Sequence, residues 1–216
     1  MKRILLTGFD PFGGELSNPS WEVARGLDAR LVDDDHQIVV AQLPCEFASS
    51  LQILEAALRQ YQPSIVLCLG QAGGRVDISV ERIAININDA RIPDNAGALP
   101  VDVPVVAGGP AAYFSSLPVK AIMHALRQAG IPASISQTAG TYVCNHVFYG
   151  LMHMAQKMDH IRQAGFIHIP YLPAQAMASP GAASMSLEVM KSGILTALEA
   201  CILNTQDLRL GGGANH

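Results

Sequence analysis

The chain has 216 residues, half of them hydrophobic, with a net charge of −4 and a sequence pI near 5.9. A chain of this length and composition buries one sizeable core, which excludes a disordered or fibrous protein, and its lack of lysine or arginine runs excludes a charged surface for nucleic acid or membranes. No apolar run is long enough for a signal-peptide core or a membrane span, so we expect a cytoplasmic protein.

The first predicted strand, Arg3 to Thr7, runs into a glycine-rich loop that carries Phe9 and Phe12. Two aromatic residues between turn formers indicate either the wall of a pocket or a loop folded back onto the core. Asn18 is typical of an N-cap, and the proline after it is typical of the first helical position, which predicts a helix continuing to Ala29. The glycines match neither GxxxxGK(S/T) nor GxGxxG, which argues against an ordinary nucleotide loop.

The next strands lead to a second glycine-rich loop. A β-branched strand is predicted at Gln37 to Leu43, and a helix at Phe47 to Leu58 has apolar residues on one face. The following strand, Ser64 to Leu69, is apolar throughout, as expected for a central parallel strand covered on both faces. It opens into a loop containing Gln71, at the strand end where ligands of open α/β sheets usually bind. Gln71 is therefore a candidate ligand contact.

An alternating pattern from Val76 to Ile87 predicts strand structure, with one hairpin near these residues, and places Glu81 on its apolar face. A carboxylate there needs a partner, and Arg82 points to the opposite face, so the partner must come from elsewhere in the fold. The alternative is a strand-end glutamate in solvent. Arg91, in the polar loop that follows, either stabilises an anion or pairs with a neighbouring aspartate.

The segment from Val103 to Pro118 has no charged residue and is too glycine-rich for a regular element. We expect it to be buried by a neighbouring subunit or to cover the site. The remaining predicted elements are a helix at Lys120 to Gln128, a strand at Ile131 to Ser136, a helix at Asn145 to Lys157, a strand at Phe166 to Ile169 and a last helix from about Met185 to Leu203.

Strands that alternate with helices predict an α/β protein with a three-layer α/β/α sandwich around a mostly parallel, mixed and twisted sheet. The pattern contains no internal repeat and no linker, which indicates a single domain at residues 1–203. Residues 204–216 end in a glycine run, and we expect this tail to be disordered.

Cys144 follows a strand and a glycine turn and precedes a helical pattern, so we expect it at or just before a helix N-terminus. Unpaired N–H groups and the positive end of the helix dipole stabilise a thiolate there, lower the pKa of the cysteine and supply donors for an oxyanion. The alternative is a packed, inert thiol. The four scattered cysteines contain no CxxC pair and suggest neither a disulfide framework nor a zinc site.

A base for Cys144 is best supplied by His168, near the end of a short apolar strand that a parallel sheet delivers to the same edge as Gln71 and the cysteine turn. His146 is poorly placed, because two helical positions turn its side chain roughly 200° away from Cys144. With the unpartnered Glu81, His168 completes a nucleophile, a base and an orienting acid. We found no set of metal ligands and no HExxH motif, so no metal or other cofactor is expected.

Longer motifs extend this pattern over nearly the whole chain before the tail: Gly8-Phe9-Asp10-Pro11-Phe12-Gly13, Asn18-Pro19-Ser20-Trp21, Gly70-Gln71-Ala72-Gly73-Gly74-Arg75, Glu81-Arg82-Ile83-Ala84, Asp89-Ala90-Arg91-Ile92-Pro93-Asp94-Asn95, Ala139-Gly140-Thr141-Tyr142-Val143-Cys144-Asn145 and His168-Ile169-Pro170-Tyr171-Leu172-Pro173. In order and spacing they resemble the pyrrolidone-carboxylate peptidases, the type I pyroglutamyl aminopeptidases. The resemblance implies a cytosolic cysteine exopeptidase, assembled as a homotetramer, that removes N-terminal pyroglutamate from peptides through a thioacyl intermediate.

The resemblance also implies a role for each site residue. Cys144 would be the nucleophile, His168 the general base and acid, and Glu81 the acid that orients His168. The pyroglutamate pocket would be lined by Phe9, Phe12, Gln71 and Tyr142, and Arg91 would lie near the oxyanion. Tyr142 stands where phenylalanine is common in bacterial members, which adds a hydroxyl to the aromatic wall.

Two other functions fit the residues without the resemblance. The first is a metal-free nucleoside or phosphate-ester enzyme of similar sandwich fold, in which Arg91 and Glu81 bind the substrate and Cys144 is inert. The second is a ligand-binding protein without catalytic activity. Fast alkylation at Cys144 alone would favour the peptidase over both.

Overall fold

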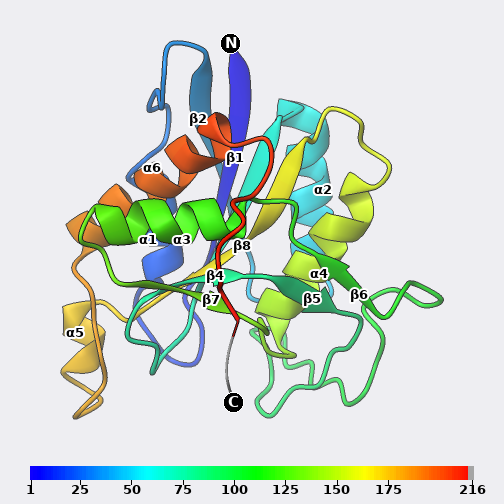
Figure 1. Ribbon diagram of the computed structural model, residues 1–216. Coiled ribbons are helices and arrows are strands. Elements are labelled where there is room, and N and C mark those ends of the chain that lie inside the picture. The colour runs from blue at the N-terminus through cyan, green and yellow to red at the C-terminus, as the bar shows by residue number, and fades with distance from the viewer. Residues whose placement is uncertain (214–216) are drawn as a thin grey trace.

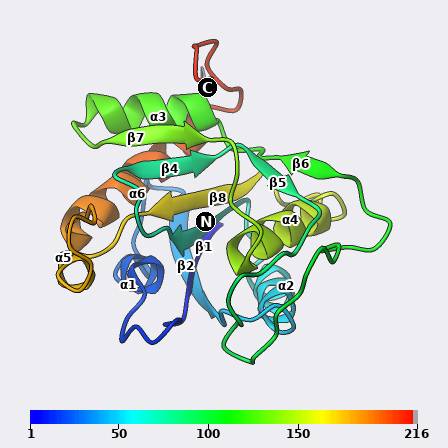
Figure 2. The same ribbon diagram turned by 90° about the horizontal axis from the view of Figure 1, so that it is seen from below.

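The computed structural model describes residues 1–213, which form a central six-stranded sheet between two layers of helices (Figures 1 and 2). The strand order is β2-β1-β3-β8-β4-β7, and β4 against β8 is its one antiparallel pair in the part of the chain that the structure describes. The strands are β1 Lys2–Phe9, β2 His36–Leu43, β3 Ile65–Gln71, β4 Ile78–Glu81, β7 Ala133–Ser136 and β8 Gln163–Ile169. The predicted α/β sandwich with a mostly parallel, mixed sheet is confirmed.

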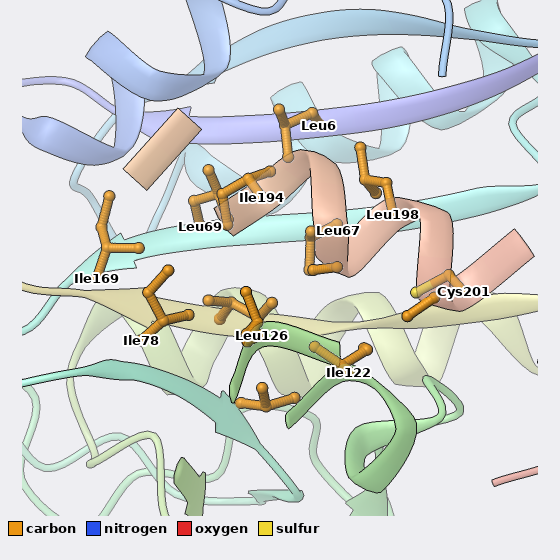
Figure 3. Close-up of a cluster of buried hydrophobic side chains, with 14 of the residues drawn as sticks. Leu6, Leu67, Leu69, Ile78, Ile122, Leu126, Ile169, Ile194, Leu198 and Cys201 are labelled. Atoms are coloured by element: carbon orange, nitrogen blue, oxygen red, sulfur yellow. The ribbon is translucent and has the colours of Figure 1, made fainter. Parts of the chain in front are cut away.

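The helices cover both faces of this sheet. One hydrophobic cluster packs α1, α3 and α6 against Leu6 and Leu67, and Figure 3 shows Ile194 and Leu198 of α6 beside them. A second cluster packs α2 and α4 against the opposite face, where Val66 lies. The helices are α1 Pro19–Arg25, α2 Ser50–Tyr61, α3 Val119–Gln128, α4 Val143–Ala155, the short α5 Pro173–Ala176 and α6 Leu187–Leu203. Because β3 and β8 are covered on both sides, their sequences are nearly continuous apolar runs.

The predicted hairpin near residues 76–87 is wrong. β4 ends at Glu81, and after Arg82 the chain enters β5, Ile83–Ile85, which pairs antiparallel with β6, Ala112–Phe114, in a separate two-stranded sheet. Asn145 of α4 holds β5 by exchanging hydrogen bonds with the backbone of Ile85. The alternating pattern therefore covers two strands in different sheets, and the segment predicted to be irregular contributes β6.

The chain after Leu203 differs from the disordered tail that we expected, as far as residue 213. Asp207 accepts hydrogen bonds from the backbone N–H groups of Lys120 and Ala121, both at 3.0 Å, at the start of α3. The N-cap position of that helix is Pro118, whose side chain makes no capping hydrogen bond, so Asp207 takes over this role from a distant part of the sequence. Residues 214–216 lie outside the described part of the chain, and the expectation of disorder stays a prediction there.

We therefore expect Asp207→Ala to lower the free energy of unfolding by about 1 kcal/mol, because two N–H groups lose their acceptor. Denaturant unfolding measures this change. Asp207→Asn, which keeps a capping oxygen, should retain most of the stability. An alanine variant as stable as the wild type would show that the tail contributes no cap.

No helix within residues 1–213 combines the length and the hydrophobicity that a membrane crossing requires.

Candidate active site

The site lies at the edge of the sheet where β1, β3 and β8 end. In the register of β3 and β8, Gly70 stands beside His168, so the two strand ends bring Gln71 and His168 to one place. There a cavity of about 170 Å³ opens. Its lining residues are Phe9, Phe12, Asn18, Cys45, Gln71, Ala139, Tyr142, Cys144 and His168. Six residues singled out in the sequence therefore share one cavity: Phe9, Phe12, Gln71, Tyr142, Cys144 and His168.

Glu81 reaches His168 because β4 and β8 are neighbouring strands. Ser79 pairs with His168 across the antiparallel ladder, and Glu81, two residues later, is fully buried. Its Oε1 atom lies 2.7 Å from Nδ1 of His168. Nδ1–H donates to the carboxylate, which leaves Nε2 as the ring nitrogen that can accept a proton. The structure thus brings together the predicted acid and base.

Glu81 has two partners in the structure, His168 and Arg75, and only His168 was predicted from the sequence. Arg75 donates from Nη1 to the same Oε1 atom of Glu81 at 2.7 Å and from Nη2 to the backbone oxygen of Thr138 at 3.1 Å. Arg75 lies in the glycine-rich loop after β3, and the sequence did not predict this contact. Its side chain bridges Glu81 and the segment that leads into Cys144.

The environment keeps His168 neutral. Burial lowers the pKa of His168 below its ordinary value, the hydrogen bond and charge of Glu81 raise it, and the positive charge of Arg75 lowers it again. The net direction is downward, because burial is the largest effect. At neutral pH, His168 is therefore an unprotonated imidazole, the form that a general base needs.

Cys144 is the second residue of α4, as the helical pattern predicted. The direction of its pKa differs from the sequence prediction. Burial raises the pKa of the Cys144 thiol above its ordinary value, with smaller increases from Cys45 and Glu81 and a decrease from the positive charge of Arg75. The resting side chain is thus a neutral thiol on the cavity wall, and it needs a base to become a nucleophile.

Gly70 makes room for this thiol. A Cβ atom at position 70 would lie 3.0 Å from Sγ of Cys144 and 2.8 Å from ring atoms of Phe166. The contact with Phe166 is closer than a real side chain tolerates, and the contact with Cys144 is tight enough to displace the thiol. A glycine on β3 is therefore part of how the fold positions Cys144.

Gly70→Ala should lower kcat of the reaction proposed below at least about 10-fold, because displacing a reacting atom by a fraction of an ångström already slows a reaction. Steady-state kinetics test this. Gly211→Ala is the matched control, since nothing lies within 4 Å of its added Cβ atom. A Gly70→Ala variant with wild-type kcat would show that Cys144 is not held by this contact.

Aromatic side chains form the apolar wall of the cavity. The rings of Phe12 and Tyr142 lie with their centroids 6.3 Å apart. The Tyr142 hydroxyl donates to the backbone oxygen of Pro93 at 3.0 Å, so its polar group is already occupied. Cys45 also lines the wall, and burial raises its pKa to about 12, which makes it a neutral, apolar neighbour. Nothing in its sequence context singled out Cys45.

Two other residues considered in the sequence lie outside this cavity. Arg91 is exposed and lines a separate cavity of about 440 Å³, which Tyr142 also borders. His146 is buried with Nδ1 3.1 Å from Oδ1 of Asn88, and burial lowers its pKa to about 4. His146 is thus a neutral packed residue. The structure does not bring Arg91 to the cysteine, and its role at an oxyanion stays a prediction.

Comparison with known proteins shows that this chain is similar to peptidases. A family model described as pyroglutamyl peptidase matches residues 2–204. The pyrrolidone-carboxylate peptidase of Klebsiella pneumoniae is 56% identical over 100% of both chains, and that of Brevibacillus brevis is 55% identical over 99% of both. The solved structure of pyroglutamyl peptidase I from Bacillus amyloliquefaciens is 47% identical with a TM-score of 0.93, covering 97% of this chain and 99% of that one. A mutant pyrrolidone carboxyl peptidase from Pyrococcus furiosus is 42% identical with a TM-score of 0.91, covering 94% and 99%.

Proposed function

Since this chain belongs to the pyroglutamyl peptidase family, we propose that it cleaves N-terminal pyroglutamate from peptides, with Cys144 as nucleophile, His168 as base and acid, and Glu81 as the residue that orients His168. One observation carries the proposal. Cys144 and His168 line the same aromatic-walled cavity, and His168 is held through Nδ1 by the fully buried Glu81.

The cavity suits a pyroglutamyl ring. This ring is a neutral lactam with no free amine, so its site needs apolar walls and partners for one N–H and one C=O. No lining residue is a carboxylate that would pair with the ammonium of an ordinary N-terminus. Phe9, Phe12 and Tyr142 supply the apolar walls, and Gln71 and Asn18 supply amide groups.

The reaction follows from these positions. Sγ of Cys144 attacks the pyroglutamyl carbonyl carbon while the thiol proton moves to Nε2 of His168. The first N–H groups of α4, which have no partner within the helix, are donors for the oxyanion, and Arg91 is a further candidate. His168 then protonates the leaving amine as the C–N bond breaks, which leaves a thioester. Water, deprotonated by His168, attacks the thioester, and release of pyroglutamate returns the proton to Cys144.

The alternative of a nucleoside or phosphate-ester enzyme is not supported. The relatives and solved structures named above are all peptidases. Arg91, which that function requires at the site, lies outside the cavity, and Arg75 is already paired with Glu81.

Location and assembly belong to the same proposal: we expect the enzyme in the cytoplasm as a homotetramer. All four cysteines are free thiols, which suits a reducing compartment. Val101, Val103 and Phe114, in and beside the uncharged segment noted in the sequence, are exposed apolar side chains that a neighbouring subunit would cover. The mass in solution, measured by light scattering, tests the assembly.

Hydrolysis of a pyroglutamyl fluorogenic amide tests the activity. The wild type should release the fluorophore, and iodoacetamide should abolish this release by modifying Cys144 alone. Chelators should leave the rate unchanged, because no step uses a metal. No release of the fluorophore, or loss of activity in EDTA that zinc restores, would contradict the proposal.

A further inference from the structure

A buried amide network lies behind the cavity. Gln175 of α5 is 7% exposed, and its Oε1 atom accepts a hydrogen bond from the backbone N–H of Leu172 at 3.0 Å. Its Nε2 atom donates to Oε1 of Gln71 at 3.0 Å. Gln71 lines the cavity and Gln175 does not, so the network connects the loop after β8 to a residue of the substrate site.

The donors and acceptors around Gln175 fix its orientation. A backbone N–H is only a donor, so the end of Gln175 that faces Leu172 must be its oxygen. The opposite end is then the NH₂ group. Its three nearest partners are all acceptors: Oε1 of Gln71, Oε2 of Glu15 at 3.4 Å and the backbone oxygen of Ser17 at 3.5 Å. Exchanging the two ends would place oxygen against oxygen at each of them.

This orientation determines that of Gln71. Because Gln175 presents a donor, Gln71 turns its oxygen toward Gln175. The NH₂ group of Gln71 is then the end left for a ligand, and among residues 1–213 it donates no hydrogen bond to a protein acceptor. A donor at this place fits a carbonyl oxygen of the substrate and does not fit an N–H group.

We propose that Gln175 is a positioning residue for specificity: it holds Gln71 with its NH₂ group toward the cavity, where that group donates to the lactam carbonyl of the pyroglutamyl ring. The proposal rests on the proposed function and adds which group reads the lactam and what orients that group. Gln175 acts through Gln71 and does not touch the substrate.

Gln175→Glu tests the proposal with almost no change in shape. A glutamate still accepts from the N–H of Leu172, but it presents an acceptor to Gln71, which should turn its NH₂ group away from the cavity. The substrate carbonyl then meets an oxygen. We expect KM for a pyroglutamyl amide to rise about 10-fold to 100-fold, with kcat within about 3-fold of wild type, because the lost contact binds substrate and transition state alike.

A double-mutant cycle separates this role from a structural one. In a Gln71→Met background there is no amide to turn, so adding Gln175→Glu should change KM less than about 2-fold. Gln52→Glu, the same change on the exposed face of α2, is the matched control and should leave KM unchanged. If the Gln71→Met variants turn over too slowly, protection of Cys144 from iodoacetamide by pyrrolidinone or cyclopentanone measures binding without turnover.

These two probes also identify which lactam group is read. Cyclopentanone has the carbonyl but no N–H, so Gln175→Glu should weaken protection by both probes by a similar factor. An unchanged KM in the single variant, or an equal rise in KM in both backgrounds, would overturn the inference. Weakened protection by pyrrolidinone alone would also overturn it, because Gln71 would then read the N–H. A wild type that does not hydrolyse pyroglutamyl amides would instead overturn the proposed function.

Discussion

Cys144→Ser is expected to lower kcat/KM for a pyroglutamyl amide at least about 10³-fold, whereas Cys68→Ser and Cys201→Ser retain activity. A hydroxyl is far harder to deprotonate than a thiol, and His168, which lines the same cavity, is a weak base because burial lowers its pKa. Steady-state kinetics with the fluorogenic amide measure the change. Tolerance is expected at the other two positions because both thiols are fully packed inside the hydrophobic clusters and away from the cavity.

The controls are chosen to separate chemistry from folding. Circular dichroism and thermal unfolding report whether each serine variant is folded. Serine loses the packing contacts of the cysteine sulfur and buries a polar hydroxyl group. Some loss of stability is therefore expected at positions 68 and 201. Equal losses of kcat/KM in all three folded variants would contradict the assignment of Cys144 as the nucleophile.

Glu81→Gln is expected to lower kcat about 10³-fold to 10⁴-fold and to change KM little. The amide keeps the shape of the side chain but removes the charge that stabilises the imidazolium formed when His168 takes the thiol proton. Since Glu81 lies behind His168 and does not line the cavity, substrate binding should persist.

The Glu81→Gln change should also shift the pH profile of kcat/KM in one direction. Glu81 raises the pKa of His168 while burial and Arg75 lower it, so removing the carboxylate charge should lower this pKa further. The acid limb of kcat/KM should therefore move to lower pH. Glu55→Gln, which breaks an exposed ion pair with Arg59 on α2, is the control and should leave both kcat and the profile unchanged. Wild-type kcat in the Glu81→Gln variant would reduce that residue to a structural role.

Much of the fold follows from local pattern. The run Ser64 to Leu69 is apolar because β3 is covered on both faces, and the spacing of Leu54 and Leu58 reflects the buried face of α2. These patterns depend only on which residues of one element are buried. They can be recognised without knowing which other element packs against it. The resemblance to the pyroglutamyl peptidase family, read from motifs over nearly the whole chain, is also confirmed.

Pairing between distant segments was not predictable in the same way. The alternation of apolar and polar residues through Glu81 and Ile83 is the same whether the strands form a hairpin or belong to two sheets. The two-residue period of a strand does not reveal which strand pairs with it. The tail was misjudged for a similar reason: Asp207 is polar and flanked by loop residues, and only the fold shows that it meets the start of α3.

At the site, the positions of the residues were easier to predict from the sequence than their electrostatic properties. Parallel strands that end at one edge brought Gln71 and His168 together as expected. Burial raises the pKa of Cys144, and a sequence does not reveal how far the fold encloses this thiol. Arg75 pairs with Glu81 across a loop, and Gln175 meets Gln71 from more than a hundred residues away, so neither contact leaves a local signal.

The central claim is that the cavity reads a pyroglutamyl ring, and matched pyroglutamyl and prolyl amides test it most directly. The two rings have nearly the same volume, so apolar walls alone discriminate weakly. The prolyl amine is protonated at neutral pH and finds no carboxylate among the lining residues, and it lacks the carbonyl to which the Gln71 amide is proposed to donate. We predict that kcat/KM is at least about 10³-fold higher for the pyroglutamyl amide. Comparable values for the two amides would contradict the account.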